Sequence, residues 1–334
     1  MPSLLDMPDL AMNLILGSLN FRSIQNLRKS CRDLRHFIDD VKPESRSSQI
    51  YIQQDLYAIH LSLDIDHQNF NIIYQKWDDG CKVKRHGIWE RILQNADYVD
   101  VAIRDIQLIL DSQKSGIVEK FEVYLIDKPG KPKCLPNVVA SKLTENLQRI
   151  LEPKSLKVKK FKITFGCQEN VMSFLPFLNA DTLEHIILRG RREKSEFDLI
   201  EISKLEQWKN AKGLKLVNFT TDLPISNFAH FQIIFMEAQT VTLQMILELK
   251  EMFFKNNIMK FFEIGFPKYD FFETQLIEFF GEPRRETMPR KREWFFRIPE
   301  DSQQLLLFVF ASHVFLFRRI RMEEVPVNAV NFDY

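Results

Sequence analysis

The chain has 334 residues, of which 45% are hydrophobic and 27% charged, a composition typical of a soluble globular protein. The 46 Lys and Arg residues nearly balance the 45 Asp and Glu residues, so the net charge of +1 provides no field that would attract nucleic acid or a membrane surface. With only 10 Gly residues, the chain has few backbone loops able to hold a phosphate.

Two compact helical patterns open the chain and end in a third. Pro8 suits the first turn of the first helix, and Ser23 can cap the second. The first helix has one apolar face, formed by Met12, Ile15, Leu16 and Leu19. The next pattern has one apolar stripe, formed by Ile24, Leu27, Cys31, Leu34 and Ile38. So short a segment buries little surface alone, and we expect it either to dock on a partner or to complete a larger core.

A polar linker at residues 41–48 separates these helices from a region in which apolar and polar residues alternate. Period-two alternation predicts antiparallel strands, and it occurs at 50–52, 58–65, 70–77 and 81–84. A helix is predicted next, at residues 99–112.

Strands and helices alternate in the remainder of the chain. Strands are predicted at 121–126, 161–165, 183–188, 214–219, 240–243 and 261–266. Helices are predicted at 137–151, 169–178 and 202–208, and segments 225–231 and 245–255 fill the remaining gaps. The strands recur about every 21 to 31 residues, the period of a leucine-rich or related β-α solenoid. Because the Asn ladder of a regular leucine-rich repeat is missing, an irregular solenoid and an open α/β sheet remain alternatives. Both predict parallel strands.

The last part of the chain predicts further strands. Residues 294–298 and 314–320 suggest two strands that close an exposed sheet edge. The most apolar stretch, 305–317, is too short to span a bilayer and is interpreted as a buried strand or helix.

Signatures of catalysis are missing from the sequence, which contains no G-x-G-x-x-G, P-loop, G-x-S-x-G or H-E-x-x-H motif. The nearest approach to a metal cluster is Asp64, Asp66 and His67, which we interpret as a solvated strand end. Cys81 and His86 could act as nucleophile and base, but nothing orders them together. We therefore expect no catalytic residue, no metal and no cofactor.

The four cysteines form no C-x-x-C pair, which indicates reduced thiols in an intracellular protein: Cys31, Cys81, Cys134 and Cys167. The N-terminus lacks the basic region of a secretory signal. We expect a cytoplasmic or nuclear protein without a membrane partner.

Two basic runs, 189–194 and 284–292, could bind RNA phosphates or direct nuclear import, but solvated loops are the favoured interpretation.

Five phenylalanine pairs are also conspicuous, at 253–254, 261–262, 271–272, 279–280 and 295–296. Adjacent residues face different ways, so we expect some of these rings to reach the surface as interface candidates.

The order of the N-terminal residues resembles the F-box family. Met7-Pro8 stands where the family has Leu-Pro, and residues 15–19 and 24–32 match its later apolar and Cys-Arg motifs. Three positions depart from the pattern, where the family commonly has Glu, Val and Trp: Leu10, Ser30 and Leu34.

Further segments resemble the nematode F-box A family, whose members follow the F-box with an FTH domain: 39–43, 158–163, 171–178, 182–186 and 205–212. The similarity covers roughly the first 270 residues. The fold class is then α/β (α+β), with a three-helix F-box, short antiparallel strands, and an irregular solenoid or open sheet. The predicted domains are an F-box at 1–41, a linker at 42–49, a β-rich connecting region at 50–118, an FTH β-α domain at 119–275, and C-terminal strands at 276–334 that continue that domain.

This resemblance implies a non-enzymatic substrate receptor. F-box proteins bind a Skp-type adaptor, which binds the cullin scaffold of a ubiquitin ligase, and the FTH domain would hold an unknown protein client. Candidate adaptor contacts are Met7, Pro8, Leu10, Met12, Ile15, Leu16, Leu19, Ile24, Leu27, Cys31 and Leu34. Some of them must also hold the F-box together, and the sequence does not separate the two roles. The alternatives are a scaffold that binds a protein or an RNA regulator without a cullin, and an enzyme of unrecognised type.

Overall fold

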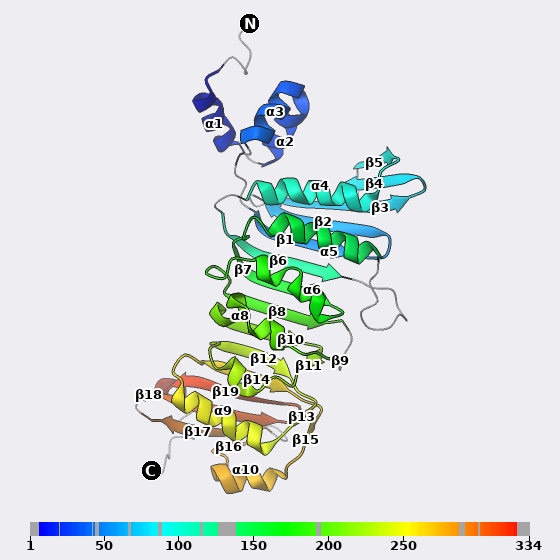
Figure 1. Ribbon diagram of the computed structural model, residues 1–334. Helices are drawn as coiled ribbons and strands as arrows, with labels where there is room; N and C mark the ends of the chain where they lie inside the picture. Colours follow the sequence, from blue (N-terminus) through cyan, green and yellow to red (C-terminus); the bar gives the residue numbers. More distant parts are fainter. Residues whose placement is uncertain are drawn as a thin grey trace. The chain divides into compact units, whose positions relative to one another are not determined.

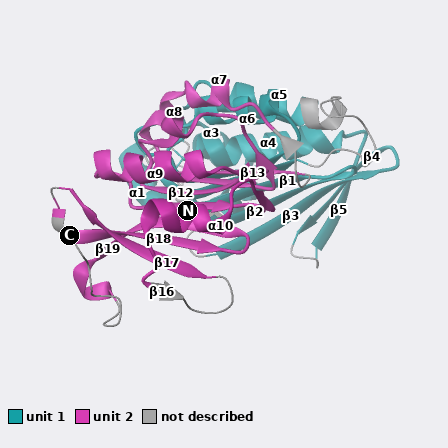
Figure 2. Cartoon of the chain, turned by 90° about the horizontal axis from the view of Figure 1, so that it is seen from below, with its two compact units in different colours: residues 1–183 teal, residues 184–334 magenta. Residues whose placement is uncertain are grey.

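A computed structural model of the chain is shown in Figure 1. It describes residues 7–19, 21–41, 43, 47–65, 68–85, 89–113, 116–125, 138–191, 195–286, 291–299 and 301–325. The chain divides into two compact units, Met1–Leu183 and Glu184–Tyr334, which Figure 2 distinguishes by colour. Each unit combines helices with a sheet, so the mixed α/β class predicted from the sequence is confirmed.

Unit 1 begins with three short helices, α1 (Asp9–Ser18), α2 (Phe21–Ser30) and α3 (Arg32–Val41). The carbonyl of Pro8 accepts hydrogen bonds from the backbone N–H groups of Ala11 and Met12 at 2.9 and 3.1 Å, which starts α1. Leu16, Ile24 and Ile38 form a small core between the helices. The half-buried side chains of Leu19, Leu27, Phe37 and Val41 pack against it.

The second predicted helical pattern is divided into two helices at Cys31. The backbone N–H of Leu34 donates to the Cys31 sulfur at 3.4 Å, so Cys31 caps α3 rather than lying inside a helix. The predicted cap at Ser23 is wrong, because α2 already begins at Phe21. Across the break, the Arg28 guanidinium donates twice to the Asp39 carboxylate, at 2.5 and 3.0 Å, and joins α2 to α3.

The sheet of unit 1 is antiparallel at one end and parallel at the other, in the order β7-β6-β1-β2-β3-β4-β5. The antiparallel strands are β1 (Ser47–Gln54), β2 (Ala58–Ile65), β3 (Gln68–Trp77), β4 (Gly80–Arg85) and β5 (Trp89–Gln94). Strand β1 also pairs in parallel with β6 (Val118–Leu125), which pairs in parallel with β7 (Val158–Phe165). The period-two pattern was therefore a reliable signal in this region.

Strand β5 was not predicted. Each of its residues except Leu93 is exposed, so it lacks the buried alternation that marks a strand in the sequence. It lies close to the start of β4, where a Cβ on Gly80 would come within 2.2 Å of the Leu93 carbonyl oxygen. Glycine at this position allows the two backbones to pair.

Helices α4 (Tyr98–Asp111) and α5 (Val138–Leu151) lie in front of the unit 1 strands in Figure 1. Helix α4 packs on β2, β3 and β4, and the Tyr74 hydroxyl of β3 donates to the Asp105 carboxylate of α4 at 2.6 Å. The helix predicted at 169–178 is shorter, since α6 (Gln168–Met172) gives way to a 3₁₀ turn, η2 (Leu175–Phe177). Pro176 explains the change, because it has no N–H to continue an α-helix.

The sheet of unit 2 contains four parallel strands in chain order: β8 (His185–Gly190), β10 (Gly213–Val217), β12 (Ile233–Glu237) and β14 (Phe261–Gly265). An antiparallel extension follows: β19 (Val314–Arg321), β18 (Asp301–Ala311), β17 (Arg292–Ile298) and β16 (Arg285–Glu286). Two small ladders lie outside this sheet and pair β9 (Ser195–Glu196) with β11 (Phe219–Thr220), and β13 (Thr240–Val241) with β15 (Lys268–Tyr269). Parallel strands agree with both predicted architectures, and the solenoid interpretation stays a prediction.

Two strand predictions in unit 2 need correction. Of the strand expected at 240–243, only the two residues of β13 form a strand, and this strand lies outside the main sheet. The position between β10 and β14 is occupied by β12 instead. Its apolar run, 233–236, lacks alternation and therefore gave no strand signal. The apolar stretch 305–317 is a hairpin formed by parts of β18 and β19 with a turn at 312–313.

The helical segments of unit 2 are α7 (Ile200–Ser203), α8 (Glu206–Asn210), η3 (Ile225–Phe228), α9 (Leu243–Lys255), α10 (Glu273–Phe280) and η4 (Met322–Glu324). The single helix predicted at 202–208 is thus two short ones. Arg319 of β19 connects the sheet to the end of α9. Its guanidinium donates to the carbonyls of Met259 and Asn256, both at 2.9 Å, and to that of Phe253. These carbonyls lie at and beyond the helix C-terminus, where a cation is favourable.

The N-cap of α4 gives a test of stability in unit 1. The Asp97 carboxylate accepts hydrogen bonds from the N–H groups of Val99 and Asp100 at 2.9 and 3.1 Å, and from the Lys142 ammonium at 3.1 Å. We expect Asp97→Ala to destabilise α4 by about 1 kcal/mol at neutral pH, since a helix cap is lost. Hydrogen exchange of the α4 amides measures the change. Exchange rates equal to those of the wild type would contradict it.

The same cap predicts a pH dependence. Partial burial alone would raise the pKa of Asp97, but the hydrogen bonds from Lys142 and Asp100 outweigh it and hold the pKa below its ordinary value. A depressed folded pKa means that the charge stabilises the fold above about pH 4 and that this stabilisation is lost as the pH falls through the folded pKa. The stability difference between the wild type and Asp97→Asn, followed between neutral and acidic pH, should therefore shrink on acidification. A difference that grows would contradict this account.

Arg319 gives a matched test in unit 2. Arg319→Met keeps an apolar stem but removes the donors to three carbonyls, and we expect the free energy of unfolding to fall by about 2–3 kcal/mol. The control is Arg318→Met, because Arg318 is exposed and only reaches Glu324 at 3.4 Å. Its expected change is under about 0.5 kcal/mol. Urea unfolding followed by tryptophan fluorescence measures both. Equal losses would show that the carbonyl contacts contribute nothing.

Candidate functional site

Burial separates the predicted adaptor contacts into sets that the sequence could not distinguish. Met12, Leu16, Ile24 and Leu34 are buried. Ile15, Leu19 and Leu27 are half-buried, and Met7, Pro8, Leu10 and Cys31 are exposed. Leu16 and Ile24 belong to the helical core, with Leu19 and Leu27 packed against it. These four residues hold the three helices together, whereas the exposed ones are available to a partner.

The most exposed apolar side chains of this region form a row that we name the outer stripe: Met7, Leu10 and Leu14. Leu10 is 74% exposed, Leu14 69% and Met7 44%. Leu10 and Leu14 lie one turn apart on α1, and Met7 comes just before the helix. Residues two positions apart point to roughly opposite sides of a helix, so the outer stripe lies opposite Met12 and Leu16.

Leu14 was missing from the sequence-based candidates. The apolar face was counted through Leu16 and Leu19, and Leu10 was included as a candidate contact, but Leu14, one turn further on the same side as Leu10, was not. A helix with apolar residues on both sides normally signals burial on both sides. That signal was present in the sequence and would have identified Leu14.

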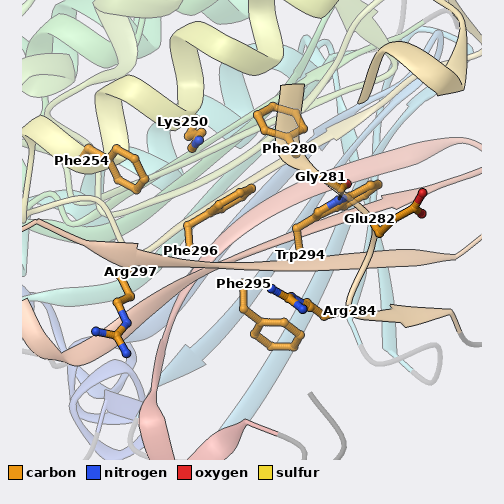
Figure 3. Close-up of a pocket in the computed structure, with 10 residues that line it drawn as sticks. All are labelled: Lys250, Phe254, Phe280, Gly281, Glu282, Arg284, Trp294, Phe295, Phe296 and Arg297. Atoms are coloured by element: carbon orange, nitrogen blue, oxygen red, sulfur yellow. Dashed lines mark hydrogen bonds between the residues drawn. The ribbon is translucent and has the colours of Figure 1, made fainter. Parts of the chain in front are cut away.

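A second feature lies in unit 2. A cavity of about 460 Å³, which we name the Lys250 pocket, is lined by Lys250, Phe254, Phe280, Gly281, Glu282, Arg284, Trp294, Phe295, Phe296 and Arg297. Figure 3 shows the rings of Phe254, Phe280 and Phe296 gathered around the Lys250 side chain. The Trp294 indole N–H donates to the Gly281 carbonyl at 2.8 Å, which ties the wall of the pocket to the end of α10.

Several members of the phenylalanine pairs noted in the sequence line this pocket. Phe253 and Phe295 are buried, whereas their neighbours Phe254 and Phe296 are only half-buried; Phe254, Phe295 and Phe296 line the cavity. The expectation that some of these rings reach the surface is confirmed most clearly by Phe272, which is 80% exposed. The pocket itself was not predicted, because its residues come from α9, α10 and β17, far apart in the sequence.

The described residues give no support to the catalytic arrangements considered from the sequence. Cys81 is fully buried, and burial raises the pKa of its thiol to about 11, which opposes formation of a nucleophilic thiolate. Asp66, His67, His86 and Cys134 lie outside the described residues. Within the described part of the chain, no group of three metal-binding side chains is found.

The basic runs are only partly described. Arg284 is exposed, and Arg292 pairs with Glu273 at 2.6 Å, while residues 192–194 and 287–290 lie outside the described ranges. Among the described helices, none is both long and apolar enough to cross a membrane.

The two faces of α1 predict opposite effects of the same substitution. Leu16→Asp would place an unpaired charge in the helical core, and we expect it to unfold α1 to α3. Leu14→Asp places the charge in solvent and should leave the helices intact. Hydrogen exchange of the amides in α1 to α3 measures both variants. Similar protection in the two variants would contradict the burial that separates them.

Comparison with known domain families matches two parts of this chain. The model of the F-box domain matches residues 4–46, which include α1 to α3. The model of the FTH domain matches residues 141–284, which include most of α5 and continue past α10. Searches of curated proteins and of solved structures gave no significant match. The two domain matches confirm the architecture expected from the sequence, an N-terminal F-box followed by an FTH domain.

Proposed function

We propose that this protein is a substrate receptor that docks through its F-box on a Skp-type adaptor of a cullin-based ubiquitin ligase and holds a protein client with its FTH domain. The F-box match supports the adaptor role in general, because F-box domains typically bind Skp-type proteins in cullin complexes. The observation that carries the proposal is the outer stripe, an apolar surface on the first helix of that domain.

The outer stripe is suited to a protein partner. Leu10 and Leu14 are large apolar side chains one helical turn apart that remain largely in water, and Met7, which comes just before the helix, is 44% exposed. Full burial of one such side chain contributes about 1.5–3 kcal/mol, so Leu10 and Leu14 could supply a substantial part of a docking energy. The exposed Pro8 and Cys31 are further predicted contacts.

The proposed chemistry is proximity rather than catalysis. A receptor that binds both the ligase and a client raises the effective concentration of one near the other, and it needs no catalytic residue of its own. Transfer of ubiquitin would be carried out by other subunits. If the alternating strands and helices form a solenoid, its repeated units would offer an extended surface to the client.

Recovery of the adaptor by the full chain tests this function. Tagged protein is isolated from cell extract and probed for the Skp-type adaptor and the cullin. We expect the wild type to retain both, and Leu10→Asp/Leu14→Asp to lose at least nine tenths of both, since charges replace the apolar contact. The matched control is Ile200→Asp/Ile258→Asp, which adds the same two charges at half-exposed apolar positions in unit 2.

The outcomes separate the docking surface from the function. Recovery by the wild type and by the double variant alike would reject the outer stripe as the contact while keeping the adaptor role. No recovery by folded wild-type protein would reject the ligase function and favour a scaffold that acts without a cullin.

A further inference from the structure

The Lys250 pocket contains a cation in an unusual setting. The Lys250 ammonium lies 4.2 Å from the ring centroid of Phe296, 5.1 Å from that of Phe280 and 5.3 Å from that of Phe254. The faces of aromatic rings attract a cation, so these three residues hold the ammonium in place. Figure 3 shows the same arrangement, with the Lys250 side chain extending from α9 toward the rings.

Among the described residues, no ion pair of Lys250 is found, and the one carboxylate that opposes the effect of burial on its pKa is that of Glu251. The side chain is half-buried, and this burial lowers the pKa of its ammonium. Neighbouring Glu251 is directed to Lys255, with which it pairs at 3.5 Å. A partly desolvated charge without a counter-ion is costly, and ring faces replace lost hydration only in part. An incoming anion would remove that cost.

The walls of the pocket favour one kind of anion. Around the ammonium they are mainly phenylalanine rings, which offer no hydrogen-bond donors, and the N–H of Trp294 is already used by Gly281. A phosphate has three strong acceptor oxygens and about two negative charges, so it needs several donors at once. A carboxylate carries one charge and matches the single ammonium.

The pocket is also suited to a peptide rather than to an isolated carboxylate. Figure 3 shows Trp294 and Phe296 on the side of β17 that faces Lys250, and Phe295 and Arg297 on the other side. The charged residues of the lining are Lys250, Glu282, Arg284 and Arg297. On the Lys250 side the lining combines apolar rings with the ammonium, and both properties complement an acidic segment with apolar neighbours.

We propose that the Lys250 pocket binds an acidic peptide segment of a client protein, with a glutamate side chain of the peptide paired with the Lys250 ammonium and an apolar neighbour packed against Phe254, Phe280 and Phe296. The proposal rests on the client-holding role proposed above for the FTH domain. It assigns to that role a place in unit 2 and a chemical class of ligand.

The test uses fluorescent peptide mixtures that differ only at the central position, which is Glu, Gln or phosphoserine, with mixed residues on both sides. Binding of the full chain is measured by fluorescence anisotropy. We expect the wild type to bind the Glu mixture at least tenfold more tightly than the Gln mixture. Lys250→Gln should abolish this preference, whereas Lys250→Arg, which keeps the charge, should retain most of it.

The matched control is Lys268→Gln, which removes a charge from an exposed position of β15 in unit 2 and leaves the pairing of Glu251 with Lys255 intact. It should leave the preference for Glu unchanged. A preference that survives Lys250→Gln, or that is lost equally in Lys268→Gln, would overturn the proposal. So would a wild type that prefers phosphoserine while binding Glu no better than Gln, or that binds the three mixtures alike.

Failure of this proposal can be told apart from failure of the proposed function. The peptide measurement needs no ligase subunit, and Lys250→Gln should still recover the Skp-type adaptor and cullin from extract. Adaptor recovery without a Glu preference would reject the pocket alone. A Glu preference without adaptor recovery would keep the pocket as a peptide site and reject the ligase function.

Discussion

Three helices of ten residues each can bury only one side of the first helix, and this limit determines how the N-terminal region is used. Leu16 meets Ile24 and Ile38 on the inner side, and among the described residues of the module no further layer covers the outer side. The sequence nevertheless places leucines at positions 10 and 14. Apolar residues there are exposed to water and are not part of the helical core, which is consistent with the docking role proposed for the outer stripe.

Two cations of unit 2 differ in how far the fold itself satisfies their charge. Arg319 and Lys250 are both partly buried cations, but their surroundings differ. The Arg319 guanidinium meets three carbonyls at the end of α9 and is thereby satisfied within the fold. The Lys250 ammonium meets ring faces alone among the described residues. Arg319 is explained by stability, whereas the described residues provide no ion pair for Lys250, and the peptide proposed above would supply one.

The sequence was most informative where one local pattern decided the structure. Alternation located β2 and β3, and helical spacing located α4, because in each case one face is buried and the other is not. Prediction failed for β12, whose apolar run has no period, and for β5, whose side chains are nearly all exposed. It also failed for the Lys250 pocket, since residues 250, 280 and 296 meet only through the packing of α9, α10 and β17. The outer stripe was only partly predicted. The spacing of Leu10 and Leu14 indicates it, but the more regular apolar pattern of the inner face drew the prediction to that face.

The two sites need not communicate for the proposed receptor to act. Effective concentration requires only that the ligase and the client be bound to one chain at the same time, and coupling between sites would arise only if each ligand changed a shared conformational equilibrium. The outer stripe lies on α1 in unit 1, and the Lys250 pocket is built from elements of unit 2. Because the proposed mechanism requires no coupling between them, substitutions at the two sites should affect binding independently. Each site can then change its chemistry without disturbing the other, and a new client could be accommodated by altering the pocket lining while the F-box surface is retained.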